Sequence, residues 1–153
     1  MKENIVNQAC IQVYHDEGFK NFIYKDTEGI DTEGIGFKVS ALSESEKSIL
    51  SAGITLDNCL KVLGLKLNRV YDELCNGIYF FNTLPDNCQI ALLDLGYQIG
   101  CHGVFKYKRC LHFLEIKDYE TASKEILDSE EAEETPNRAK HIASLIWEKP
   151  ADE

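Results

Sequence analysis

The sequence has no long apolar run and no recognisable leader segment. No stretch of its residues approaches the roughly 18 consecutive apolar residues that a membrane-spanning helix needs. The opening stretch, MKENIVNQACIQVYHDEG, lacks the basic region, the apolar run and the small-residue cleavage site of a secretory signal. We therefore expect the chain to be made in the cytoplasm and to be neither exported nor anchored by a segment of its own.

Positive charge is scarce. The chain carries 26 acidic and 16 basic residues, which gives a net charge of −10. Nucleic acids and anionic membrane surfaces attract proteins through lysine and arginine, so this balance argues against both as partners. We expect no nucleic-acid binding and no membrane insertion.

Cysteine and histidine are present without forming a metal-binding motif. The six cysteines lie far apart and include no C-x-x-C pair (Cys10, Cys59, Cys75, Cys88, Cys101 and Cys110). No carboxylate or cysteine lies at ligand spacing from both His102 and His112, so we predict no metal site. The thiols are expected to be small buried side chains in a reducing compartment. Disulfides formed after release into an oxidising compartment are the alternative, which thiol counting under non-reducing conditions decides.

The composition of the chain is that of an ordinary soluble globular protein. Of its 153 residues, 44% are hydrophobic and 27% are charged, which fits one compact domain in which two lobes share a core. Apolar residues at three- and four-residue spacings predict an amphipathic helix over residues 4–16. The helix runs into Asp16 and Glu17 before Gly18 ends it, and two carboxylates at that position oppose the helix dipole.

The chain changes character twice after this first helix. Residues 19–39 have the aromatic, isoleucine and glycine content of a β-hairpin or meander, with turns at the Glu-Gly pairs. The rest reads as helix, with segments expected at about 43–51, 55–77, 85–98, 105–115 and 118–129 and a last helix from Thr135 and Pro136. Ser43 with Glu46 forms a capping-box pattern, and Thr55 is a second expected N-cap.

These elements predict a mostly α member of the α+β class with two lobes. We expect a small N-terminal β-hairpin or sheet lobe over about 15–54 and a long connecting helix over about 55–75. A helical C-terminal lobe over about 76–153 would include the N-terminal helix in its packing. A cleft between two such lobes is the natural place for a site.

The stretch DTEGIDTEGI, residues 26–35, repeats one five-residue word. A shift of five fits neither helix nor strand, since in a strand it moves each side chain to the opposite face. Asp26 and Asp31, or Thr27 and Thr32, should therefore meet different surroundings. If the stretch forms a site, we expect one member of each pair to belong to it.

Six acidic residues fall between positions 15 and 37: Asp16, Glu17, Asp26, Glu28, Asp31 and Glu33. A calcium loop of the EF-hand type fails, because counting from Asp26 puts Gly29 at position 4 and Asp31 at position 6, where glycine is required. A solvated, turn-rich hairpin is one interpretation of the acids. A pair of carboxylates for glycoside hydrolysis, one protonated and one ionised, is the other.

The full string of residues favours the second interpretation. It reads Glu17-Gly18, then Tyr24-x-Asp26-x-x-Gly29-x-x-Thr32-x-Gly34-x-Gly36. This pattern resembles the phage-type lysozymes, the muramidases of T-even phages and their bacterial relatives. The resemblance continues at TPNRAK (135–140), at Gln98-Ile99-Gly100 and in the order of the helices, so it spans nearly the whole chain.

The resemblance implies a role for each matching residue. Glu17 would be the general acid, Asp26 the ionised partner, and Thr32 would help hold the attacking water. Arg138 would pair with Glu17. Thr27 and Asp31 would be turn and surface positions, and Gly29 and Gly34 would serve the backbone in turns that need φ > 0.

The resemblance also implies a lysozyme fold and an activity. The protein would hydrolyse, with inversion, the β-1,4 bond between N-acetylmuramic acid and N-acetylglucosamine in peptidoglycan. Gln98 and Thr135 are the expected substrate contacts. No cofactor is implied, the glycan strand is the expected partner, and a monomer is expected. The protein would reach the wall of a bacterium after lysis or with the help of another protein.

The chain departs from the family in three ways. Phe37 stands where a histidine is usual after G-x-G, which we interpret as a change in packing and stability, with an altered subsite as the alternative. Asp31 and Glu33 replace aromatic or apolar residues and are expected to add negative charge beside the cleft, raising carboxyl pKa values there. The acidic run DSEEAEE (128–134) is expected to be a solvated loop, in a chain of net charge −10 where these phage lysozymes are basic.

Three alternatives stay open at this stage. The acidic surface favours a variant lysozyme for a less anionic glycan, such as one whose amino sugars are deacetylated. A lytic transglycosylase needs a catalytic glutamate without a partner aspartate, so the presence of Asp26 and Thr32 argues against it. A wall-binding module without turnover would have no need of Glu17, Asp26 and Thr32.

Overall fold

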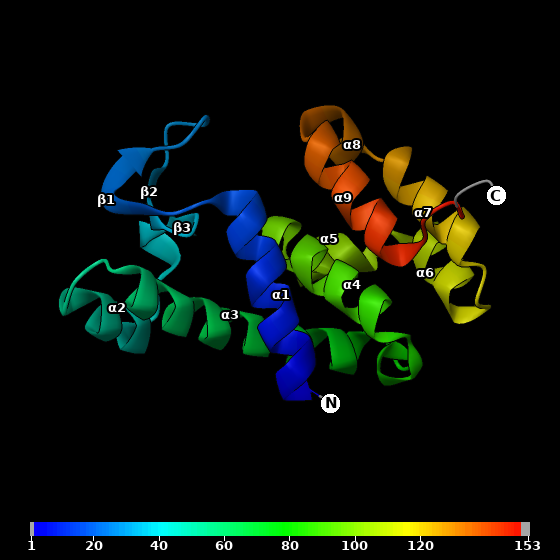
Figure 1. Ribbon diagram of the computed structural model, residues 1–153, viewed down its shortest axis with the longest axis horizontal. Helices are drawn as coiled ribbons and strands as arrows, with labels where there is room; N and C mark the ends of the chain where they lie inside the picture. The colour runs from blue at the N-terminus through cyan, green and yellow to red at the C-terminus, as the bar shows by residue number, and fades with distance from the viewer. Residues whose placement is uncertain (1, 151–153) are drawn as a thin grey trace.

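The computed structural model describes residues 2–150, which form a mostly helical molecule with a small three-stranded sheet near the N-terminus (Figure 1). The helices are α1 (Lys2–Glu17), α2 (Glu44–Ser51), α3 (Leu56–Gly77), α4 (Asp86–Ile99), α5 (Cys101–Phe105), α6 (Lys108–Glu115), α7 (Tyr119–Leu127), α8 (Glu130–Glu134) and α9 (Pro136–Ile146), with short 3-10 turns at Val39–Ala41 and Phe81–Thr83. The predicted fold class, α+β and mostly α, is confirmed.

The sheet contains β1 (Lys20–Lys25), β2 (Asp31–Gly34) and β3 (Phe37–Lys38), all antiparallel and in the order β1-β2-β3. Tyr24 pairs with Thr32, and Thr32 pairs with Lys38. The two turns use Gly29 and Gly34 with φ of 77° and 63°, values that side chains rarely allow. The prediction that these two glycines serve the backbone is confirmed.

Two helices begin at the residues that the sequence predicts. The Ser43 side chain accepts a hydrogen bond from the Glu46 N–H, while the Glu46 carboxylate accepts one from the Ser43 N–H. The Thr55 hydroxyl accepts from the Asn58 N–H and so caps α3. Caps of this kind typically stabilise a helix by about 1 kcal/mol each.

The core is continuous from the sheet to the C-terminal helices. Its largest fully buried side chains are Ile5, Ile35, Phe37, Leu63, Leu67, Leu74, Phe81, Leu92, Leu93, Leu95, Leu114 and Ile126. Helix α4 is buried on most of its surface because it packs against α1, α3 and α9. Among the described residues, no helix has both the length and the apolar character to cross a membrane.

The cysteines are free thiols, and most of them contribute to this core. Cys59, Cys88, Cys101 and Cys110 are buried, whereas Cys10 and Cys75 are half-buried. Burial raises the pKa of Cys59 and Cys88 to about 11 and that of Cys110 to about 12, so these thiols stay protonated and unreactive. The expectation of small buried side chains holds for four of the six.

Two segments differ from the prediction. The helix expected over 105–115 is α6, which begins three residues later at Lys108, and the short helix α5 before it was not expected. The acidic run, which was expected to be a loop, contains α8. The Ser129 side chain caps this helix by accepting a hydrogen bond from the Ala132 N–H. Glutamates in the first turn of a helix are stabilised by its dipole, and this explains why an acidic segment takes helical form.

The arrangement of these elements sets the position of the site. Figure 1 shows the sheet and α2 at one end of the molecule, α4 to α9 at the other, and α3 running between them. Helix α1 crosses α3, contacts α4, and leads directly into β1. The last turn of α1 therefore lies where the sheet faces the helical part.

Candidate active site

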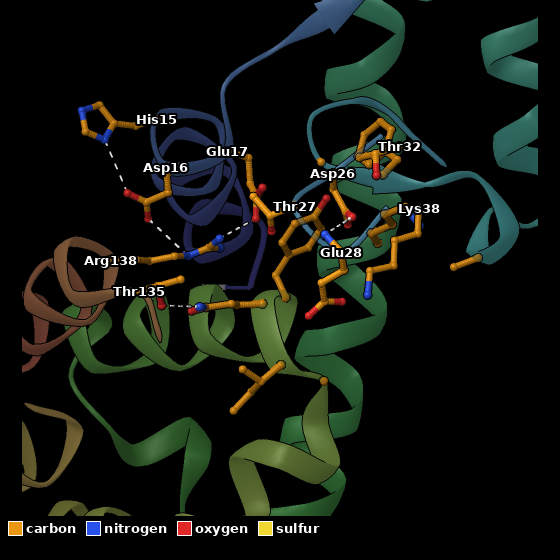
Figure 2. Close-up of a pocket in the computed structure, with 18 of the residues that line it drawn as sticks. His15, Asp16, Glu17, Asp26, Thr27, Glu28, Thr32, Lys38, Thr135 and Arg138 are labelled. Atoms are coloured by element: carbon orange, nitrogen blue, oxygen red, sulfur yellow. Dashed lines mark hydrogen bonds and ion pairs between the residues drawn. The ribbon is translucent and has the colours of Figure 1, made fainter. Parts of the chain in front are cut away.

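A cleft of about 1050 Å³ lies between the sheet and the helical part of the molecule. Its lining comes from the end of α1, the sheet and its turns, the end of α4, and the start of α9. Figure 2 draws the side chains that face it. All six residues predicted for the site line this cleft: Glu17, Asp26, Thr32, Gln98, Thr135 and Arg138.

Glu17 is the last residue of α1, and its carboxylate accepts a hydrogen bond from Arg138 Nη1 of α9. This contact compensates for the two carboxylates at the end of the α1 dipole. The close approach of the Glu17 side chain to the turn before β3 depends on Gly36, whose φ is 69°. A Cβ at position 36 would lie 2.5 Å from Glu17 Oε2, so only glycine leaves room for this carboxylate.

Besides Glu17, Arg138 binds a second carboxylate, that of Asp94 on α4. Its Nη2 and Nε donate to Asp94 Oδ1 at 2.6 Å and 3.1 Å, and its Nε lies 3.8 Å from Asp16 Oδ2. Asp94 is fully buried on α4, and the sequence alone did not predict its place in the site. Nothing in the spacing of the chain marks it, because its contact with Arg138 joins residues 44 positions apart.

The pKa values of the neighbouring carboxyl groups of Asp16 and Asp94 shift in opposite directions. Burial, together with the hydrogen bond to Asp16, raises the pKa of Asp94 to about 7. Burial opposes the charge of Asp16, but the Asp94 hydrogen bond and the charges of His141 and Arg138 outweigh it and lower the pKa of Asp16. Asp94 Oδ2, the oxygen turned away from Arg138, has no hydrogen-bond partner within residues 2–150.

Asp26 follows β1 and is fixed by the turn that it starts. Its Oδ1 accepts hydrogen bonds from the N–H groups of Glu28 at 2.8 Å and Ile30 at 2.9 Å. The Ile30 N–H is the largest cause of a pKa below the ordinary value for aspartate, and Lys38 adds to it. Asp26 is therefore held as an anion at neutral pH, beside the cleft.

This result corrects the expectation that neighbouring acids raise the pKa of Asp26. Asp31 is turned to an ion pair with Lys25, 2.6 Å away, and is not part of the cleft lining. Glu33 is buried on the other face of β2 and is also outside the lining. The alternation of strand side chains separates Glu33 from Thr32. The repeated aspartates and glutamates each place one member on the cleft, but both threonines line it, so the expectation of one member from each pair is wrong for Thr27 and Thr32. Thr27, expected to be only a turn residue, does line the cleft.

Thr32 and Phe37 line the cleft on the side of the sheet. Thr32 is buried, and its hydroxyl donates to the Ile30 carbonyl at 2.9 Å. Phe37 is 1% exposed and lies with its ring 5.6 Å from Lys66 Nζ. The interpretation of Phe37 as a packing residue is consistent with this burial.

Comparison with known proteins assigns the chain to a family. Residues 14–143 match the family model described as Phage lysozyme. The chain belongs to the phage lysozyme family. Two relatives from Dictyostelium discoideum, "Probable T4-type lysozyme 1" and "Probable T4-type lysozyme 2", are each 25% identical over 151 residues, which cover 86% of this chain and 89% of each relative. The resemblance drawn from the sequence is confirmed.

In this phage lysozyme family member, Gln98 and Thr135 lie side by side on the helical wall of the cleft. Gln98 Nε2 donates to Thr135 Oγ1 at 2.9 Å and to Glu131 Oε2 at 3.0 Å. The Thr135 hydroxyl donates to the Glu131 carbonyl at 3.0 Å and makes no capping bond to α9. Thr135 has the N-cap position that was predicted, but its side chain belongs to this polar cluster.

Tyr97 is a further residue of the cleft that the sequence analysis did not find. Its hydroxyl donates to the Ile35 carbonyl at 2.7 Å and joins α4 to the turn before β3. Burial, followed by the charge of Glu17, raises the pKa of Tyr97 well above its ordinary value. The available signal was its place beside Gln98 in the matched motif.

Proposed function

We propose that the protein is a muramidase that hydrolyses, with inversion, the β-1,4 bond between N-acetylmuramic acid and N-acetylglucosamine of peptidoglycan. The observation that carries the proposal is that Glu17 and Asp26 face one cleft in different electrostatic environments. Glu17 is held by an arginine from α9, whereas Asp26 is held by backbone N–H groups of a turn. A general acid and an ionised carboxylate on one cleft are the groups that glycoside hydrolysis requires.

Glu17 is proposed to protonate the leaving glycosidic oxygen. Arg138 positions the Glu17 side chain, but it also donates two hydrogen bonds to Asp94 and lies near Asp16. Competition from these carboxylates weakens the attraction of Arg138 for a negative charge on Glu17. Substrate binding further excludes water from the cleft, which disfavours an unprotonated carboxyl group.

Asp26 and Thr32 are proposed to serve the other side of the reaction. The anionic Asp26 would stabilise positive charge at the anomeric carbon as the bond breaks. The Thr32 hydroxyl donates a hydrogen bond to the Ile30 carbonyl. Its oxygen lone pairs are therefore available to accept a hydrogen bond from the attacking water. In an inverting enzyme the two carboxyl groups flank the scissile bond with room for this water.

Gln98 and Thr135 are proposed to bind the glycan on the opposite wall. Their mutual hydrogen bond fixes both side chains, and the remaining lone pairs and N–H groups can meet sugar hydroxyls or acetamido groups. The cleft volume of about 1050 Å³ suits an extended ligand. We also propose that the protein acts as a monomer on the bacterial wall, after release or delivery by another protein.

The products of digestion test this proposal. Purified peptidoglycan is incubated with the protein, and the released fragments are read by mass and by the NMR signal of the newly formed anomer. Hydrated muramic acid reducing ends, formed first as the inverted anomer, are expected. Anhydro ends would move the assignment to a lytic transglycosylase. Intact glycan, with protein still bound to the wall, would favour a binding module.

A further inference from the structure

A cluster of two histidines and one aspartate lies at the rim of the cleft. His15 and Asp16 stand in the last turn of α1, and His141 stands on α9. One ligand atom from each of the three lies within 4.8 Å of the other two. We propose that these three side chains bind a Zn²⁺ ion that links α1 to α9.

The spacing of the donor atoms fits such an ion. His141 Nδ1 lies 3.0 Å from Asp16 Oδ1, and His15 Nδ1 lies 3.5 Å from the same oxygen. Zinc binds nitrogen and oxygen at about 2.0–2.2 Å, so two ligand atoms on a tetrahedron stand roughly 3.3 Å apart. Both measured distances are close to this separation. Figure 2 shows the His15 ring directed toward the Asp16 carboxylate.

The protein already holds the Asp16 ligand in place. The Asp16 side chain is 8% exposed and is oriented by Asp94 and by Arg138 Nε, 3.8 Å from its second oxygen. Hydrogen bonds behind a ligand carboxylate are the usual means of fixing its direction. The His15 side chain is 81% exposed, so its ring can turn to complete the site without disturbing the core.

The local charge also favours a cation. Asp16 offers a carboxylate that a cation can bind directly, and Glu17 places a second carboxyl group next to it in α1. The two imidazoles are ligands of choice for zinc and related transition ions, while calcium and magnesium prefer sites built only from oxygen. Three protein ligands leave a fourth position for water.

This inference departs from the sequence-based expectation of no metal site. His15 and His141 are 126 positions apart, so spacing along the chain gave no sign of them. The fold brings them together because Arg138, one turn before His141 on α9, contacts Glu17 next to Asp16. The inference does not rest on the proposed activity, since zinc binding is measured without substrate.

Isothermal titration of the purified chain with ZnCl₂ tests the site. We expect the native protein to bind one Zn²⁺, and His15→Ala and His141→Ala each to weaken binding at least tenfold. His102→Ala and His112→Ala are matched controls, since these two histidines lie outside the cluster and all six cysteines are kept. Both controls should bind zinc as the native protein does.

A thermal melt gives a second readout that does not depend on the titration heats. Because an ion between α1 and α9 binds the folded chain and not the unfolded one, zinc should raise the Tm of the native protein and of both controls. It should leave the Tm of His15→Ala unchanged, and His15 is exposed enough that this variant folds. Native-like zinc affinity in both His15→Ala and His141→Ala, or no zinc binding by the native chain, would overturn the proposal.

Discussion

Asp94 acts on the proposed chemistry only through Arg138. Its Oδ1 accepts two hydrogen bonds from the guanidinium that positions Glu17. Hydrogen bonds to charged groups contribute about 1.5–3 kcal/mol each. Without them, in Asp94→Ala, the Arg138 side chain should no longer be fixed beside Glu17. We expect a fall of about 10- to 100-fold in kcat with little change in KM, since each 1.4 kcal/mol is tenfold.

Asp94→Asn is the conservative variant for this prediction. Its amide oxygen still accepts from Arg138, so it should keep most of the activity that Asp94→Ala loses. Initial rates on solubilised glycan and circular dichroism of each variant measure the effect and the fold. A folded Asp94→Ala enzyme with native kcat would show that Arg138 needs no support from α4.

Gly36 limits the space beside Glu17. Gly36→Ala adds a Cβ 2.5 Å from Glu17 Oε2, at a residue with φ of 69°. The strain should cost about 1–2 kcal/mol of unfolding free energy, and displacement of the carboxylate should lower activity at least tenfold. Gly29→Ala is the matched control, because Gly29 has a φ of 77° but nothing within 4 Å of the added Cβ.

The two alanine variants are compared by urea unfolding and by activity. Both should lose similar stability, and only Gly36→Ala should lose most of its activity. Equal losses of activity in both variants would mean that backbone strain, and not contact with Glu17, decides the role of Gly36.

At the scale of elements, Glu46 joins the start of α2 to α3. Its side chain is buried, and it pairs with Arg69 at 2.7 Å and Lys66 at 3.3 Å. Burial alone would raise the pKa of Glu46, but the Ser43 N–H, Arg69 and Lys66 together lower it. The folded state therefore binds the proton more weakly than the unfolded chain does, for which the ordinary value is 4.5.

The sign of this shift predicts an acid-sensitive contribution to stability. The contribution is complete above about pH 4.5 and is lost as the pH falls through the lower folded pKa. Glu46→Gln should cost about 3 kcal/mol at pH 7, as expected for breaking a buried ion pair, and the difference should shrink in acid. Urea unfolding from pH 7 to pH 3 measures it. Glu44→Gln, in the same helical turn but with a side chain 94% exposed, should stay near the native curve throughout.

Local signals predicted the elements better than the breaks between them. The capping box at Ser43, the Thr55 cap and the turn glycines depend on neighbours within a few residues, so the sequence contains the whole cause. The break at Lys106 and Tyr107 between α5 and α6 depends on how these helices pack, which periodicity does not reveal. The acidic run forms α8 because Ser129 caps its start and the glutamates of its first turn favour the helix dipole, although the run was predicted to be a loop.

The candidate site shows the same division. Glu17, Asp26 and Thr32 come from one short string, and the match to a family supplied their partners Gln98, Thr135 and Arg138. Asp94 and Tyr97 support the site through contacts 44 and 62 positions away along the chain. Contacts between residues so far apart along the chain form only on folding, and no periodicity or motif in a single sequence predicts them.

At the scale of the whole molecule, the net charge of −10 should govern how the protein meets its substrate. An anionic wall repels an acidic protein, and salt screens the repulsion over about 10 Å at 0.1 M. On normal peptidoglycan we expect the rate to rise between about 10 mM and about 150 mM salt, because the screening length falls from about 30 Å to about 8 Å over this range.

Deacetylated peptidoglycan carries amino groups and should reverse this salt dependence. Initial rates on both substrates at a series of salt concentrations measure the effect. A preference for the deacetylated substrate at low salt would support a role for the acidic surface in selecting the glycan. Equal rates on the two substrates, with one common salt dependence, would refute that role.

The measurement that tests the account most directly compares Glu17→Gln with Glu28→Gln in one digestion of purified peptidoglycan. Both residues line the same cleft and both variants remove one negative charge, but only Glu17 has the proposed role of general acid. We expect Glu17→Gln to release fragments at least about a hundredfold more slowly than the native protein, as loss of general acid catalysis typically costs about 10²–10⁴ in rate. Glu28→Gln should release them at close to the native rate. Native-like release by folded Glu17→Gln would contradict the account.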